Sequence, residues 1–158
     1  RGFNMKVIVF DMDGTIADLY GVDGWLEMLR AENPMPYEIA EPMVDMNKLS
    51  TVLNELAVLG WTIAITSWLS MNSTQAYKNA VRKAKREWLA KTGLPIEEIH
   101  LVQYGTPKQK CTEGDIQILF DDSADVRESF YDYDKGRIAV NPTEIDIINF
   151  LEDLIKNS

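Results

Sequence analysis

The feature that most constrains this chain is an alternation of short apolar runs with segments of helical periodicity, repeated five times. Residues 6–10, KVIVF, form a β-branched run that is too short for a helix, and comparable runs cover residues 61–66, 99–103, 116–120 and 137–140. Such runs are typical of buried strands. Strands that alternate with helices indicate a parallel sheet with helices on both faces, so we expect a doubly wound α/β fold with five strands.

Two long helices are predicted between these strands. In residues 46–59 the apolar side chains form one stripe, and Gly60 is placed to end the helix. A longer helix is predicted over residues 73–92, with Asn72 or Ser73 at its start. Five residues give its expected buried face: Tyr77, Ala80, Val81, Ala84 and Trp88.

The remaining segments are shorter. Apolar spacing predicts a helix within residues 22–32, and a further helix is expected over residues 123–131. Residues 33–44 contain three prolines and are expected to be an irregular loop. Thr143 and Asp146 resemble a capping box, which would open a last amphipathic helix.

Composition excludes several kinds of chemistry. The 158 residues include one Cys and one His, which leaves no internal disulfide, multi-Cys zinc site or His cluster. A formal net charge of −9 argues against a general nucleic-acid binder, because phosphate backbones would be repelled. No apolar stretch reaches the length of a membrane span.

The length favours one domain over residues 5–158. Residues 1–4, which precede Met5, are interpreted as a cloning remnant before the natural start. The sequence shows no signal peptide and leaves its one Cys unpaired, so we expect a cytoplasmic protein.

Four carboxylates follow two of the predicted strands. Asp11 and Asp13 come directly after residues 6–10, while Asp121 and Asp122 follow residues 116–120. In doubly wound sheets, ligands bind beyond the carboxyl ends of the strands. Adjacent acids after an apolar run are costly unless a cation balances them, although a helix N-cap would explain part of the pattern. Mg²⁺ prefers such oxygen ligands, so we expect a magnesium site here.

Hydroxyl and amino groups follow the other strands. Thr66 and Ser67 end the second strand, where a hydroxyl could bind a phosphoryl oxygen or simply start the next helix. The loop after the third strand contains Lys108 and Lys110, either of which could reach a phosphate. The alternative is a solvated loop lysine.

These segments resemble, in order, the four motifs of the haloacid dehalogenase superfamily of phosphohydrolases. FDMDGT at residues 10–15 resembles the first motif, IAITS at 63–67 the second, and ILFDDS at 118–123 the fourth. The third motif would be Lys108 or Lys110; the YGTPK segment favours Lys108, but the spacing leaves both open.

The resemblance implies a role for each acid. Asp11 would attack phosphorus and form an aspartyl-phosphate. Asp13 would protonate the leaving oxygen and then activate water. Asp11, Asp122 and the backbone carbonyl of Asp13 would bind Mg²⁺, and Asp121 would support a metal-bound water. The presence of Asp13 favours a phosphatase, because dehalogenase members lack this second acid.

The resemblance also implies phosphate-binding roles for Thr66, Ser67 and Lys108. Substrate selection in this superfamily usually depends on an inserted cap, but here residues 16–45 leave room only for a flap and a minimal cap. The DMDGTIADLYG segment resembles 5′(3′)-deoxyribonucleotidase-like and phage-type nucleotidases, which implies a nucleotide 5′-phosphatase. A polynucleotide 3′-phosphatase and a non-catalytic phosphate- or partner-binding protein are the alternatives.

Two further features bear on the substrate. Tyr20, Trp25 and Trp68 could stack on a base, although Trp25 could instead be a core contact of its helix. Trp68 is the preferred one because it directly follows the second motif. The segment 72–95 carries six cations against Glu87, a net charge of +5, so the rest of the chain carries −14. This predicted helix could steer an oligonucleotide, or it could simply be a solvated face. The sequence predicts a small phosphorylated substrate, no membrane partner and no particular oligomeric state.

Overall fold

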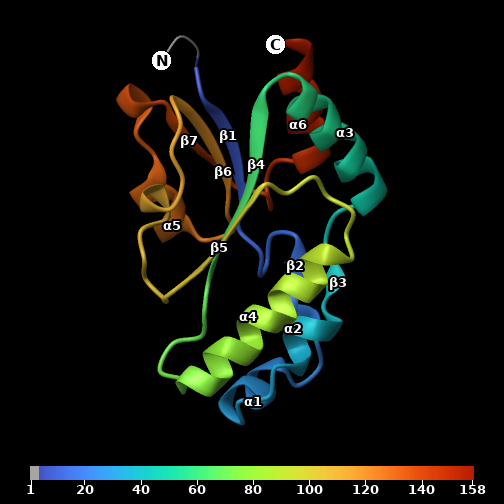
Figure 1. Ribbon diagram of the computed structural model, residues 1–158, viewed down its shortest axis with the longest axis vertical. Coiled ribbons are helices and arrows are strands. Elements are labelled where there is room, and N and C mark those ends of the chain that lie inside the picture. Colours follow the sequence, from blue (N-terminus) through green and yellow to red (C-terminus); the bar gives the residue numbers. More distant parts are fainter. Residues whose placement is uncertain (1–3) are drawn as a thin grey trace.

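The computed structural model describes residues 4–158, so the predicted remnant at residues 1–4 lies, apart from Asn4, outside the described residues. Its centre is a five-stranded parallel sheet in the order β5-β4-β1-β6-β7 (Figure 1). The strands are β1 (Lys6–Phe10), β4 (Trp61–Trp68), β5 (Glu98–Val102), β6 (Ile116–Phe120) and β7 (Arg137–Val140). The predicted fold class is therefore confirmed, and all five strands lie within two residues of their expected bounds.

The strand order places the first motif at the reversal point of the sheet. Phe10, the last residue of β1, pairs with Ile65 of β4 on one side and with Phe120 of β6 on the other. The chain moves outward from β1 through β4 to β5, and then returns to the opposite side of β1. Residues after β1, β4 and β6 consequently meet at one edge of the sheet, where ligands bind in such folds.

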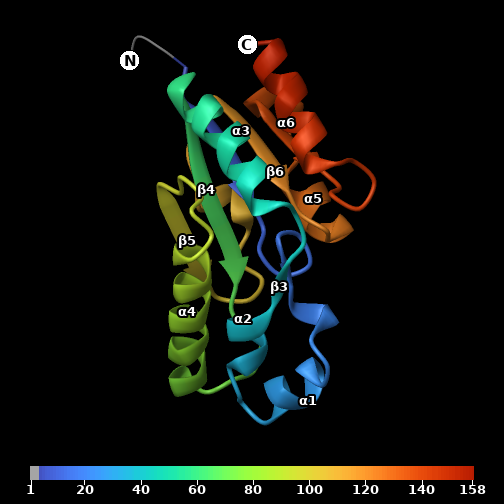
Figure 2. The same cartoon turned by 90° about the vertical axis from the view of Figure 1, so that its right-hand side faces the viewer.

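Helices cover both faces of the sheet. Helices α3 (Met46–Val58) and α6 (Ile147–Lys156) pack on one face, and α5 (Ala124–Phe130) packs on the other (Figures 1 and 2). Each buries an apolar stripe, for example Leu49 and Leu53 of α3.

A second group of helices extends beyond the carboxyl ends of the strands. It comprises α1 (Trp25–Arg30), α2 (Met35–Ile39) and α4 (Gln75–Ala90), which we call the helical lobe (Figure 2). Strand β2 (Ala17–Asp18) pairs antiparallel with β3 (Glu41–Pro42) where the chain enters and leaves the part of this lobe that contains α1 and α2. The 3₁₀ turn Leu19–Gly21 connects β2 to the segment that precedes α1.

The expectation of an irregular loop over residues 33–44 is wrong, because this segment contains α2 and β3. Pro34 and Pro36 lie at the start of α2, where proline is tolerated because the first helical N–H groups have no partner within the helix. Asn33 Oδ1 accepts the N–H of Met35 at 3.0 Å, and Pro36 and Tyr37 are buried. Tertiary packing thus stabilises a helix that proline content argued against.

Two predicted helix starts are also wrong. Helix α4 is capped by Thr74, whose hydroxyl accepts the N–H of Tyr77, rather than by Asn72 or Ser73. Helix α6 is capped by Asp146, and the hydroxyl of Thr143 donates instead to Asn141 Oδ1. Capping residues cluster near each start, so the pattern located the helices but not their first residues.

Within residues 4–158, the structure contains no helix with both the length and the apolar content that a membrane crossing requires.

Candidate active site

Asp11 lies directly after β1 and is buried. Its backbone N–H donates to the carbonyl of Phe120 at 2.9 Å, which ties it to the end of β6. The hydroxyl of Thr15 donates to Asp11 Oδ2 at 2.9 Å. Gly14, between them in the chain, has φ +82°, and a Cβ at this position would collide with the Asp122 carboxylate. The turn after β1 therefore requires glycine to bring these groups together.

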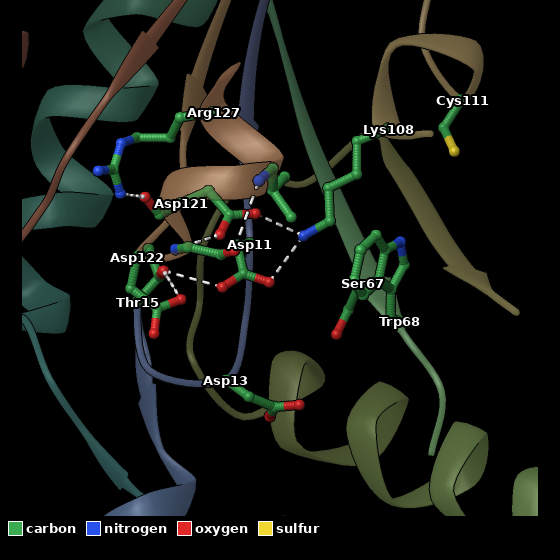
Figure 3. Close-up of polar contacts among 12 residues, drawn as sticks. Asp11, Asp13, Thr15, Ser67, Trp68, Lys108, Cys111, Asp121, Asp122 and Arg127 are labelled. Atoms are coloured by element: carbon green, nitrogen blue, oxygen red, sulfur yellow. Dashed lines mark hydrogen bonds and ion pairs between the residues drawn. The ribbon is translucent and has the colours of Figure 1, made fainter. Parts of the chain in front are cut away.

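Lys108 provides the positive charge of the site (Figure 3). Its Nζ donates to Asp11 Oδ1 at 2.8 Å and to Asp121 Oδ2 at 2.7 Å. Burial alone would lower the pKa of Lys108, but the charges of Asp11 and Asp121 outweigh burial and raise it. Of the two lysines that the sequence left open, the structure brings Lys108 to Asp11 and leaves Lys110 exposed.

Three carboxylates form a potential metal site. Asp11, Asp121 and Asp122 each offer an oxygen within 4.8 Å of the other two. Burial, together with the neighbouring Asp11 and Asp121, raises the pKa of Asp122 to about 7. Like charges at this separation favour proton uptake or a cation, and an all-oxygen donor set fits a hard divalent cation such as Mg²⁺. The residues present therefore fit the metal that the sequence predicts.

Asp13 does not join this cluster. Its side chain lies apart from Asp11 and points toward α4 (Figure 3). There Asp13 Oδ2 accepts a hydrogen bond from Nζ of Lys85 at 2.9 Å. The same Nζ donates to Ser67 Oγ at 2.7 Å and to the carbonyl oxygen of Trp68 at 2.9 Å. Lys85 itself is completely buried.

Sequence reasoning missed Lys85, which it counted among the cations of a solvated or oligonucleotide-steering helix face. A signal was available: Lys85 lies four residues after Val81 and three before Trp88, on the predicted buried face of α4. A lysine at such a position needs an anionic partner, because its charge is otherwise too costly to bury. The basic face of α4 therefore has one cation fewer than predicted.

The two hydroxyls after β4 have different surroundings. Ser67 lines the cavity in front of Asp11, whereas Thr66 does not. The Thr66 side chain is fully buried, and its Oγ1 has no hydrogen-bond partner among residues 4–158. The structure thus places Ser67, Asp13 and Lys108 on the cavity wall and keeps Thr66 behind it.

The cavity in front of Asp11 has a volume of about 760 Å³ and lies between the sheet edge and the helical lobe. Tyr20 and Trp25 line one part of it, packed edge to face with ring centres 5.0 Å apart. Trp68 and Tyr104 line another part, with ring centres 4.9 Å apart. Two aromatic pairs therefore form parts of the wall of the cavity that contains the acidic cluster.

Trp68, the preferred stacking residue, has contacts that constrain its ring. Its indole N–H donates to the carbonyl of Thr106 at 2.8 Å, and Lys108 Nζ lies 5.6 Å from the ring centre. The ring therefore packs beside the buried lysine and also forms part of the cavity wall. Trp25, which is half-buried, likewise lines the cavity.

Comparisons with known proteins define the fold. No family model matches the chain, and no curated protein matches it. Among solved structures, the chain resembles the crystal structure of D,D-heptose 1,7-bisphosphate phosphatase from Burkholderia thailandensis, with 14% sequence identity and a TM-score of 0.53. The match covers 95% of this chain and 98% of that chain. At this identity the likeness shows the fold alone, which is a five-stranded parallel sheet with helices on both faces.

Proposed function

We propose that this protein is a Mg²⁺-dependent phosphatase that hydrolyses a phosphomonoester through an aspartyl-phosphate at Asp11. The observation that carries the proposal is the environment of the Asp11 carboxylate. Lys108 and Thr15 hold its two oxygens, and Asp121 and Asp122 lie beside it. Phosphoryl transfer depends mainly on positioning and on stabilising charge at the equatorial oxygens, and this arrangement supplies both.

In the first step, the Asp11 carboxylate attacks phosphorus while the bond between phosphorus and the leaving oxygen breaks. Asp13 donates a proton to that oxygen. In the second step, Asp13 accepts a proton from water, which attacks the phosphorus and releases phosphate and free Asp11. Burial raises the pKa of Asp13, although Lys85 opposes the shift, and a raised pKa suits a group that alternates between acid and base.

Asp11 and Asp122 would hold Mg²⁺ with the backbone carbonyl of Asp13, and Asp121 would support a coordinated water. When bound, the ion neutralises carboxylate charge and stabilises negative charge on the phosphoryl oxygens. Lys108 and Ser67 face the same cavity as Asp11 and would bind the phosphoryl group. Thr66 remains a proposed phosphate ligand because its hydroxyl has no partner among residues 4–158, although its side chain is fully buried and does not line the cavity.

The first test is release of phosphate from an aryl phosphate, with and without Mg²⁺. We expect activity only with Mg²⁺, and Asp11→Asn should lower kcat by at least about 1,000-fold because the nucleophile is lost. A wild-type protein without activity toward any phosphomonoester would favour the non-catalytic alternative. Full activity of Asp11→Asn would contradict the mechanism.

For the substrate, we propose a nucleotide, hydrolysed at its 5′-phosphate. The aromatic walls of the cavity support this choice, since bases stack on aromatic rings at about 1–3 kcal/mol per base. The segment 16–45, which forms α1 and α2 above the cavity, would act as a minimal cap. A panel of nucleoside monophosphates compared with sugar phosphates tests this, and equal kcat/KM for both groups would contradict it.

A polynucleotide 3′-phosphatase is the second proposal, favoured by the positive charge that remains on α4. Five cations of α4 and its C-terminal cap are not fully buried: Lys78, Arg82, Lys83, Arg86 and the capping residue Lys91. If this face steers an oligonucleotide, Arg82→Glu with Arg86→Glu should raise KM for a 3′-phosphorylated oligonucleotide while KM for a mononucleotide stays unchanged. Equal KM changes for both substrates would contradict steering.

A further inference from the structure

Lys85 is a fully buried lysine that the mechanism above does not use. It lies on α4, and its side chain reaches the end of β4 and the turn after β1. A lysine ammonium has three N–H donors and no acceptor. Here the three donors meet three acceptors, namely Asp13 Oδ2, Ser67 Oγ and the carbonyl of Trp68, at 2.7–2.9 Å. Lys85 therefore has no donor left for a substrate.

The position of Lys85 relative to the cavity also indicates that it does not contact the substrate. Asp13 and Ser67 line the cavity, whereas Lys85 is not part of the cavity wall. Lys108, by contrast, lines the cavity and contacts Asp11 directly. Any effect of Lys85 on chemistry must therefore pass through the cavity-lining residues that it contacts, above all the side chains of Asp13 and Ser67.

The hydrogen bonds from Lys85 determine which atoms of Asp13 and Ser67 remain available to a ligand in the cavity. Ser67 Oγ accepts from Lys85, so its own hydroxyl proton is available for donation to an acceptor in the cavity. Asp13 is held through Oδ2, and its Oδ1 has no hydrogen-bond partner among residues 4–158. The free oxygen is the one that can carry a proton to or from a group in the cavity.

The helical lobe contributes one more contact to Lys85. The Tyr37 ring of α2 lies with its centre 5.1 Å from Lys85 Nζ, so the ammonium is enclosed by α2, α4 and the ends of β1 and β4. A cation next to an aromatic ring in a water-excluded position is held firmly. This enclosure limits the freedom of the lysine, and hence of Asp13.

We propose that Lys85 is a positioning residue that fixes Asp13 as proton donor and acceptor and orients Ser67 toward the phosphoryl group. The inference rests on the proposed phosphatase function. It predicts that loss of Lys85 harms the proton-transfer part of the reaction more than the rest. Proton donation matters most when the leaving oxygen is strongly basic, and little when it leaves readily as an anion.

The experiment compares two substrates in Lys85→Met, using single-turnover release of the leaving group. For an alkyl phosphate, whose leaving oxygen needs a proton, we expect the rate to fall by about 100-fold. For 4-nitrophenyl phosphate we expect a loss of less than about 10-fold, because its leaving group needs no acid. Lys156→Met, which removes an exposed lysine from α6, is the control and should leave both rates unchanged.

A double-mutant cycle with Asp13→Asn separates positioning from general destabilisation. If Lys85 acts through Asp13, then Lys85→Met should change the alkyl-phosphate rate less than about 2-fold in the Asp13→Asn background. Equal losses for the two substrates, or additive losses in the cycle, would overturn the proposal and leave Lys85 a purely structural role. A wild-type enzyme that hydrolyses neither substrate would instead overturn the phosphatase function.

Removing a buried charge can impair folding, so Lys85→Gln serves as a second variant. Glutamine keeps hydrogen-bond donors but loses the positive charge, and we expect the same dependence on leaving group. Circular dichroism and thermal unfolding check that each variant is folded before its rates are read. If neither Lys85 variant folds while Lys156→Met does, the lysine is structural and the positioning role is withdrawn.

Discussion

Two buried lysines make an instructive comparison, because they carry the same charge in different surroundings. Lys108, in the 3₁₀ turn Lys108–Lys110 after β5, lies between two carboxylates and lines the cavity. Lys85, on α4, contacts one carboxylate, one hydroxyl and one carbonyl and lies behind the cavity wall. Lys108 thus offsets the negative charge of the sheet edge, whereas Lys85 joins the helical lobe to that edge. The number and type of acceptors, rather than burial, distinguish the two roles.

The largest expected effect on activity belongs to Lys108. Lys108→Met leaves Asp11 and Asp121 without their shared cation and removes a charge that would face the phosphoryl group, so we expect kcat to fall by about 100- to 1,000-fold. Lys110→Met, at an exposed position two residues later, should change kcat by less than about 2-fold. Steady-state kinetics on an aryl phosphate measures both. Similar losses in the two variants would contradict the assignment to Lys108.

The second prediction concerns stability: removing Lys85 should lower the free energy of unfolding far more than removing an exposed lysine of the same helix. Lys85→Met leaves Asp13, whose side chain is 16% exposed, without its ion-pair partner; breaking one side of a fully buried pair costs about 3–5 kcal/mol, so we expect a loss of about 2–4 kcal/mol. Lys83→Met is the matched control on the same helix, because the Lys83 side chain is 77% exposed and its ion pair with Glu87 spans 3.9 Å. We expect the control to change the free energy of unfolding by less than about 0.5 kcal/mol. Urea unfolding measures both changes. Equal changes in Lys85→Met and Lys83→Met would show that the buried pair contributes nothing to stability.

A smaller effect on the free energy of unfolding should come from pH. It would arise in the acidic cluster around Lys108. The pKa of Asp122 is raised to about 7 by burial and by Asp11, whereas an unfolded aspartate titrates near 4. Between these values the folded protein binds a proton that the unfolded chain has lost. Without metal, this group makes the free energy of unfolding fall as pH rises from about 4 to about 7.

We therefore expect Mg²⁺ to raise Tm by several degrees more at about pH 7.5 than at about pH 5, because the cation replaces the proton among the carboxylates. Thermal unfolding in Mg²⁺ and in a chelator, at both pH values, measures the difference. Asp122→Asn should remove most of it. A Mg²⁺ effect that does not depend on pH would place the ion elsewhere.

The smallest predicted effect concerns Trp68, which packs beside Lys108. Trp68→Phe keeps an aromatic ring but loses the N–H that donates to Thr106. We expect kcat to fall by about 2- to 5-fold, in line with the loss of one hydrogen bond worth about 1 kcal/mol. If Trp68 also stacks on a base, Trp68→Ala should raise KM for nucleotides more than for sugar phosphates. Steady-state kinetics on both substrate classes would show whether the ring positions Lys108, binds the substrate, or does both.

The sheet and its carboxylates were predictable for a local reason. Each strand is a contiguous apolar run, and the acids follow their strands directly, so Asp11 and Asp122 needed only the rule that parallel strands end at one edge. The proline-rich segment 33–44 was mispredicted because α2 is stabilised by packing against α4 and by burial of Tyr37, which local propensity does not contain.

The sequence by itself determined the fold class, the sheet edge that collects the acids and the short list of groups that could act there. Hydrophobic periodicity and residues placed directly after strands carry that information. The tertiary structure decided which lysine reaches Asp11, where Asp13 points and why α4 buries a charge. These three features depend on contacts between residues far apart in the sequence. Lys108 and Asp11 are 97 residues apart, and Lys85 and Asp13 are 72 residues apart. Only a folded chain brings such distant groups within hydrogen-bond distance.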